Sequence, residues 1–130
     1  MMGVLNRISA LSATMAVSAA LAVVPAAHAS AASNCWDGGF KVSDPGGGVY
    51  EAYWCHNVNT AAYIPASYDD SVGSLDSNPS WFACKTDSGA WNGEGSPHPY
   101  RWVWTEADDG EWGWVPDSDI IDETNPIPYC

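Results

Sequence analysis

Histidines and carboxylates are the side chains of this sequence that could act as general acids, general bases or partners of a nucleophile. His56 directly follows Cys55, and His98 lies between Pro97 and Pro99. Nucleophilic catalysis needs a nucleophile on a rigid turn with a base beside it, and no G-x-S-x-G run accompanies either histidine. A glycosidase needs two carboxylates at a fixed separation across a cleft, which a chain this short can barely build. The sequence therefore predicts no catalytic residues and no enzymatic activity.

The cysteines form the second chemically specific set: Cys35, Cys55, Cys84 and Cys130. Their spacing contains no C-x-x-C pair of the kind that holds zinc, so we expect neither a metal nor a cofactor. In a small secreted domain an even number of cysteines predicts disulfides, here with three possible connectivities. Residues 34–60 have the pattern of a hairpin whose open ends carry Cys35 and Cys55. This favours the Cys35–Cys55 bridge and, by exclusion, Cys84–Cys130.

Acidic residues crowd two places in the second half of the chain. The two groups are Glu106, Asp108, Asp109 and Glu111, and then Asp117, Asp119, Asp122 and Glu123. Calcium takes about six to eight oxygen ligands, so such groups could bind it weakly outside the cell. The spacing of an EF-hand loop is absent. We interpret both groups as a solvated, solubilising acidic surface, with weak calcium binding as the alternative.

Residues 1–29 have the pattern of a secretory signal peptide. Arg7 precedes a run of Ala, Val and Leu that extends to about Val24, and Pro25–Ala29 follows. A membrane span needs roughly 20 strongly apolar residues, and this run is shorter and rich in alanine. A retained membrane anchor is the alternative. We predict cleavage after Ala29 and an extracellular protein that has no membrane attachment after cleavage.

The part that follows residue 29 is strongly acidic and rich in aromatic residues. Its three basic residues, Lys41, Lys85 and Arg101, stand against all 16 acidic residues. This charge argues against nucleic acid, anionic lipid and other polyanions as partners. All eight Trp, six Tyr and two Phe residues also lie there, which argues against a disordered acidic tail. About 100 residues can bury one modest core.

The local pattern is that of an all-β protein. Short runs of Trp, Tyr, Val and Thr alternate with Gly, Pro, Asn, Asp and Ser, which predicts short strands joined by turns. The predicted elements are a hairpin over 34–60 with its turn at 45–48, a strand over 80–85, a strand over 100–106, a turn over 107–110, a returning strand over 111–115, and a closing apolar step at 120–121.

Residues 61–122 also contain an ordered series of short motifs. They are Tyr63–Tyr68, Val72–Leu75, Trp102–Thr105, the turn Asp108–Gly110, Gly113–Val115, Pro116–Asp119 and Ile120–Ile121. Their order resembles that of the bacterial SH3-like (SH3b) domain. The Arg-x-Gly-Pro run that is usual in the long first loop of that family is missing, and no catalytic partner is fused here. The resemblance implies a small barrel of five or six short strands that binds a ligand, often peptidoglycan or a peptide.

We therefore expect a signal peptide over 1–29, an N-terminal hairpin extension over 30–60 and an SH3-like barrel with a C-terminal tail over 61–130. In SH3-like barrels the binding groove lies between the long first loop and the later hairpin. Strand alternation places two indoles on one face of the first hairpin strand, and a third lies on the paired strand. The predicted ligand-binding residues are Tyr68, Trp102, Trp104 and Trp114.

The expected function is that of a secreted, non-enzymatic binding module for cell-wall peptidoglycan or a cell-surface peptide. Nearby acids favour cationic groups of the ligand, such as a lysine or diaminopimelate amine, because indole faces and carboxylates both attract ammonium groups. The alternative is a small secreted inhibitor or interaction protein that targets another exported protein. A basic partner protein would be attracted by this charge at low salt.

Overall fold

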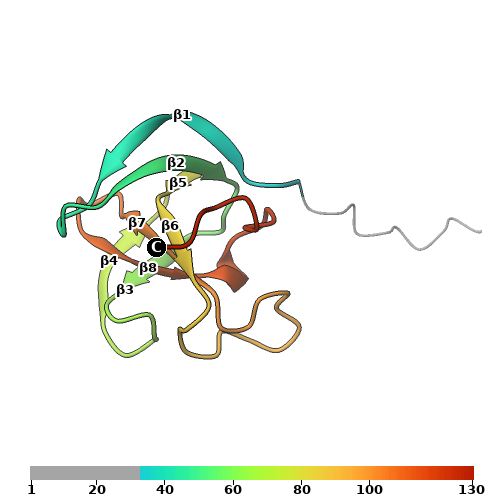
Figure 1. Cartoon of the computed structure of the whole chain (residues 1–130). Helices are drawn as coiled ribbons and strands as arrows, with labels where there is room; N and C mark the ends of the chain where they lie inside the picture. Colours follow the sequence, from blue (N-terminus) through green and yellow to red (C-terminus); the bar gives the residue numbers. More distant parts are fainter. Residues whose placement is uncertain (1–32) are drawn as a thin grey trace, which may run out of the picture.

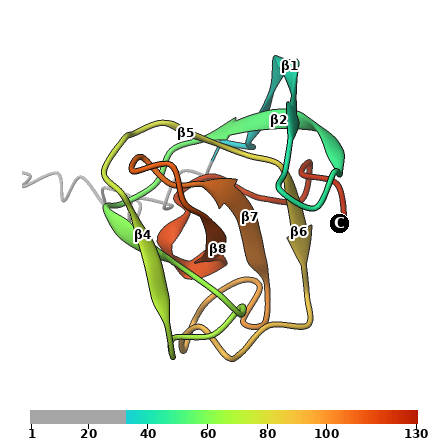
Figure 2. The ribbon, with the colours of Figure 1, turned by 90° about the vertical axis from the view of Figure 1, so that its left-hand side faces the viewer.

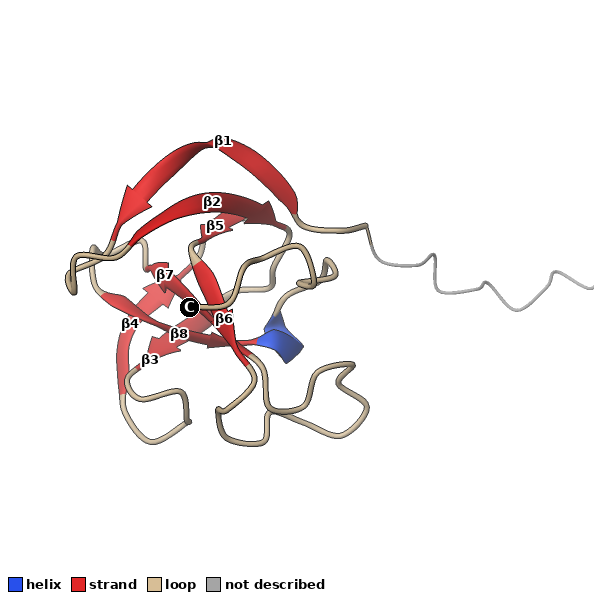
Figure 3. Ribbon diagram, in the orientation of Figure 1, coloured by secondary structure: helices blue, strands red, loops and turns tan. Residues whose placement is uncertain are grey.

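The computed structural model describes residues 33–130, and the predicted signal peptide lies outside these residues. This part of the chain folds into eight strands and one short 3-10 helix, arranged as two antiparallel sheets (Figures 1 and 3). No helix within 33–130 is long and apolar enough to cross a membrane. The prediction of a small all-β fold is confirmed, whereas the closed SH3-like barrel stays a prediction.

The first sheet has the strand order β1-β2-β5, with β1 at Trp36–Ser43, β2 at Val49–Cys55 and β5 at Ser80–Phe82. The β1–β2 hairpin and the disulfide between Cys35 and Cys55 were both predicted, and both are confirmed. The hairpin is not an appendage, however. Because β2 pairs along its other edge with β5, the β1–β2 hairpin and the segment 61–130 share one sheet.

The second sheet has the order β4-β3-β8-β7-β6. Its strands are β3 at Thr60–Tyr63, β4 at Ser71–Leu75, β6 at Cys84–Thr86, β7 at Trp102–Glu106 and β8 at Trp112–Pro116. The predicted β7–β8 hairpin is confirmed in register, with Trp104 opposite Trp114. Gly110 closes its turn at φ +92°, a backbone conformation that glycine adopts without steric cost.

The core consists of inward-facing residues from both sheets. Phe82 comes from the first sheet, Ala62, Val103 and Val115 come from the second, and all four are buried completely. The chain crosses between the sheets at Ala83, where a predicted continuous strand over 80–85 is broken into β5 and β6. This break lets residues 80–82 extend the first sheet while residues 84–86 pair with β7.

The C-terminal segment runs along β6, the last strand of the second sheet (Figure 2). The backbone N–H of Lys85 donates to Pro128, that of Cys130 donates back to Lys85, and the predicted disulfide joins Cys84 to Cys130. Ile127 from this segment is buried completely in the core. The predicted closing step at 120–121 is reduced to a single bridge between Asn57 and Ile120, which follows the 3-10 helix η1 at Asp117–Asp119.

Two of the three basic residues that follow residue 29 are buried, at Lys85 (4% exposed) and Arg101 (5%). The third, Lys41, is exposed and lies 3.7 Å from Glu51. Asp117 and Asp122 are buried as well, so the exposed surface of 33–130 keeps the strongly negative net charge of the composition, with Lys41 as its exposed Lys or Arg. Its carboxylates repel one another, and salt screens that repulsion over about 10 Å at 0.1 M.

We expect the melting temperature to rise by several degrees between 10 mM and 150 mM sodium chloride, the shift that about 1 kcal/mol produces in a domain of this size. Thermal melts followed by circular dichroism would measure it. A melting temperature that is independent of salt would contradict the inference of net repulsion. If calcium at matched ionic strength stabilises the domain well beyond sodium, a calcium site exists.

Candidate functional site

The outer face of the β7–β8 hairpin carries a group of half-buried indoles. Residues alternate along each strand, so Val103 and Val115 face the core while Trp104, Trp112 and Trp114 face away from it. The ring centroids of Trp104 and Trp114 lie 4.9 Å apart, and those of Trp104 and Trp112 lie 5.8 Å apart. These separations are within the range of favourable aromatic pairs.

The same line of rings continues onto the first sheet. The Trp81 ring lies 5.5 Å from that of Trp112, and Phe40 lies 6.4 Å from Trp81 and 6.0 Å from Trp54. Trp54 and Trp81 are direct neighbours across the β2–β5 pair, so their side chains share a face. We call the resulting surface the aromatic row; its members are Phe40, Trp54, Trp81, Trp112, Trp104 and Trp114.

The structure separates the predicted ligand-binding residues into two groups. Trp104 and Trp114 belong to the aromatic row, whereas Tyr68 packs at 5.0 Å from Trp102 and 5.5 Å from Tyr63. Tyr68 is exposed, so it remains available to a ligand.

Trp102 was predicted to contact the ligand, and this prediction is wrong, since Trp102 is 0% exposed. Its indole N–H donates to the carbonyl oxygen of Ala90 at 2.8 Å. A Cβ added at Gly89 would overlap the Trp102 ring, so the loop after β6 lies directly on the indole. Trp102 is thus part of the packed interior, although it shares a strand face with Trp104.

Carboxylates border the aromatic row. Asp44, in the β1–β2 turn, accepts a hydrogen bond from the Trp104 indole N–H at 3.2 Å, and Glu106 is the cross-strand neighbour of Trp112. Asp108 accepts hydrogen bonds from the backbone N–H groups of Asp76 and Ser77 at 2.6 and 2.7 Å. Partial burial would raise the pKa of Asp108, but these bonds and one from the Ser77 hydroxyl hold that pKa below its ordinary value. Its charge persists to acidic pH.

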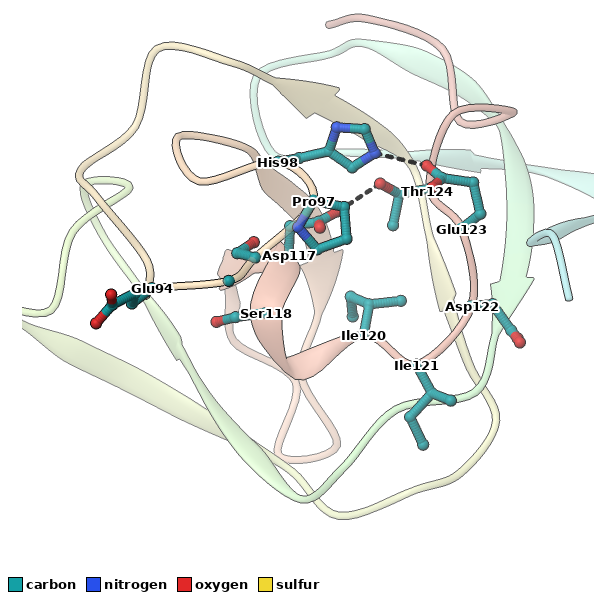
Figure 4. A pocket seen from close by; sticks show the side chains of 12 residues that line it. Glu94, Pro97, His98, Asp117, Ser118, Ile120, Ile121, Asp122, Glu123 and Thr124 are labelled. Carbon is teal, nitrogen blue, oxygen red and sulfur yellow. Dashed lines mark hydrogen bonds and ion pairs between the residues drawn. The ribbon is translucent and has the colours of Figure 1, made fainter. Parts of the chain in front are cut away.

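Apart from the aromatic row, the surface has a concavity of about 270 Å³ between the loop 94–98 and the segment 117–124 (Figure 4). His98 Nε2 lies 2.7 Å from Glu123 Oε1, and the Thr124 hydroxyl donates to Asp117. Burial raises the pKa of Asp117, although this hydrogen bond and the nearby His98 and Arg101 side chains act in the opposite direction. These groups bond to one another and so hold the C-terminal segment in place.

The C-terminal acidic group is therefore not the solvated surface that the sequence suggested. Asp117 and Asp122 are about 95% buried, and Asp122 accepts hydrogen bonds from the backbone N–H and the ring Nδ1 of His56 at 2.6 and 2.8 Å. Asp119 accepts one from the Thr60 hydroxyl at 2.6 Å. Within 33–130, no set of three or more His, Cys, Asp or Glu side chains is arranged to hold a metal ion.

Comparisons of the chain with protein-family models, with curated proteins and with solved structures gave no match. The aromatic row is thus interpreted from its own geometry. The predicted site omitted Phe40, Trp54, Trp81 and Trp112. Strand alternation could have added Trp112 to Trp114, but the other three join the row only because β2 pairs with β5.

Proposed function

We propose that this chain is a secreted, non-enzymatic binding module that holds a peptide-bearing ligand on its aromatic row. The observation that carries the proposal is the run of six aromatic rings outside the core, in which the centroids of paired rings lie 4.9 to 6.4 Å apart. Phe40 is exposed and the five indoles are half-buried, and contiguous apolar surface of this kind marks sites of interaction. Trp side chains also provide large contact areas at low conformational-entropy cost.

The disulfides support a role outside the cell. Both bridges join cysteines that are far apart in sequence, and within 33–130 there is no free cysteine. Disulfides of this kind persist in oxidising, extracellular environments. Secretion through cleavage after Ala29 is the part of the proposal that the sequence pattern of residues 1–29 supports.

The ligand class follows from charge and from the SH3b resemblance. The acidic border of the row disfavours polyanions and favours ligands with amino groups. Peptidoglycan stem peptides and cell-surface peptides carry such groups, and the resemblance of residues 61–122 to SH3b domains points to the same class. The exposed acidic surface also fits a second function, that of an interaction protein for a basic exported protein.

Binding to purified cell walls and to an immobilised secreted proteome, compared side by side, tests the proposal. We expect Trp104→Ala to weaken binding about tenfold or more, because truncation of a central aromatic side chain typically removes a large part of the binding energy. Trp91→Ala is the matched control, since Trp91 is 56% exposed and lies in the loop between β6 and β7.

The proposal requires Trp104→Ala to lose binding while Trp91→Ala retains it, with both variants folded by circular dichroism. Equal binding by the parent, Trp104→Ala and Trp114→Ala would refute it. Preference for the cell walls would support the peptidoglycan class, and preference for basic secreted proteins at low salt would support the second function.

A further inference from the structure

One end of the aromatic row borders a hollow of about 230 Å³. Its apolar lining includes the indoles of Trp54 and Trp81 and the ring of Pro79. Trp54 and Trp81 stand side by side because they are direct partners in the β2–β5 pair, and both are half-buried. The hollow is therefore continuous with the aromatic row rather than a separate feature of the surface.

The lining of the hollow also carries two carboxylates, Glu106 at the end of β7 and Asp108 in the following turn. Glu106 is exposed and next to Trp112 across the β7–β8 pair. Asp108 is held in place by three hydrogen bonds from residues 76 and 77. Two indoles and two carboxylates thus meet in one depression.

The described part of the chain supplies no positive charge to this depression. None of the ion pairs within 33–130 includes Glu106 or Asp108. Lys41 lies beside Glu51 on the β1–β2 hairpin, and Lys85 and Arg101 are buried at the C-terminal segment. The charge of the hollow is left for a ligand to neutralise.

We propose that this hollow receives a lysine or arginine side chain of a peptide that lies along the aromatic row. The inference rests on the proposed function, since it assigns a subsite to the same ligand. The cationic head would lie against the indole faces and near Glu106, and the methylene stem would cover Pro79 and the edges of the rings. Cation–π attraction and charge complementarity act together at such a site.

A hard metal ion fits the hollow poorly. Calcium requires about six to eight oxygen ligands, whereas Pro79 and the two indoles offer none from their side chains. Both oxygen atoms of the Asp108 carboxylate already accept hydrogen bonds from residues 76 and 77. An organic cation, which needs few directional ligands and gains from aromatic faces, matches the lining better.

The probe for the test is Nα-acetyl-lysine N-methylamide, and its Nε-acetylated analogue is the uncharged control. Titration would be followed by the ¹⁵N–¹H signals of the indole N–H groups, with those of Trp54 and Trp81 assigned from Trp→Phe variants. We expect saturable shifts of these two signals with the charged probe and none with the acetylated analogue.

Glu106→Gln should raise the dissociation constant of the charged probe about threefold or more. A change of this size corresponds to the loss of one partly exposed ion pair. Glu111→Gln is the matched control, because Glu111 is an exposed acid in the same hairpin, does not line the hollow, and changes the net charge equally. Equal weakening by both variants, or equal binding of both probes, would overturn the assignment of the hollow.

The two proposals fail in distinguishable ways. If Trp104→Ala abolishes binding to walls or partner proteins while the lysine probe leaves Trp54 and Trp81 unaffected, the aromatic row stands and the cation subsite is rejected. If the probe binds at the hollow and Trp104→Ala leaves binding to both macromolecular ligands unchanged, the subsite exists and the proposed function of the row is rejected.

Discussion

Replacing Arg101 with methionine should destabilise the domain by about 1–3 kcal/mol, because several hydrogen-bond acceptors lose a buried, charged donor. Arg101 is 5% exposed; its Nε donates to Asp87 at 2.7 Å, and its Nη1 donates to Asn125 at 2.9 Å and to Thr124 at 3.2 Å. Without the guanidinium, the buried carboxyl of Asp117 loses a favourable positive charge. The C-terminal segment loses its main polar attachment to the start of β7.

Urea unfolding at pH 7 would measure this loss, with Lys41→Met as the control. Lys41 is exposed, so the same change of charge there should cost at most about 1 kcal/mol. Similar losses in the two variants would show that Arg101 acts through overall charge rather than through its buried contacts.

The deficit of Arg101→Met should shrink as the pH falls. In the parent, the bond from Arg101 holds the pKa of Asp87 below its ordinary value, a stabilisation that is present above the unfolded pKa and lost at lower pH. The pKa of Asp117 is raised, so that carboxyl becomes neutral early during acidification, and its need for Arg101 then disappears. The Asp87 contribution is lost only below about pH 4, the ordinary pKa of an aspartate, so the measurements must extend to about pH 3. A deficit that is the same or larger at about pH 3 than at pH 7 would contradict this account.

Local chemistry was sufficient to predict much of the fold. The Pro45–Gly48 turn predicted the β1–β2 hairpin, and with it the Cys35–Cys55 bridge and, by exclusion, Cys84–Cys130. The Asp109–Gly110 turn predicted the β7–β8 hairpin in the same way. The two hairpins depend on contacts between residues near in sequence and on turn geometry that glycine makes accessible, and the second bridge follows by exclusion once the first is assigned.

Features that depend on distant contacts were not predictable. The break of the 80–85 strand at Ala83 follows from the pairing of β2 with β5 and of β6 with β7, which no local pattern encodes. The buried Asp122 likewise bonds to His56, and the buried Asp117 lies close enough to Arg101 for that charge to act on it; both partners come from earlier parts of the chain. Isolated from these partners, acidic residues near a chain end have the pattern of solvated surface.

The predicted site shows the same limit. Strand alternation correctly placed Trp102 and Trp104 on one face of β7, but alternation does not tell which part of a face the loops cover. The loop after β6 covers Trp102 through Gly89 and Ala90 and leaves Trp104 partly open. The burial of side chains on the outer face of a sheet is therefore decided by loop packing. Neither the two-residue alternation along a strand nor the amino-acid composition predicts that packing.

Trp102→Ala and Trp104→Ala should accordingly have opposite signatures, although the residues are two positions apart on the same face. Loss of the completely buried Trp102 ring should cost about 3–5 kcal/mol, because it removes the ring's contacts and leaves the Ala90 carbonyl without its donor. Loss of the half-buried Trp104 ring should cost less than about 2 kcal/mol.

Urea unfolding and ligand binding, measured on both variants, separate the two roles. Trp102→Ala should unfold at lower urea while its folded fraction keeps the affinity of the parent, because the aromatic row does not include that ring. Trp104→Ala should keep most of its stability and lose affinity. If Trp104→Ala is the less stable variant, its ring belongs to the packed interior, and the binding role of the aromatic row then falls to Trp54, Trp81 and the hollow between Pro79 and Glu106.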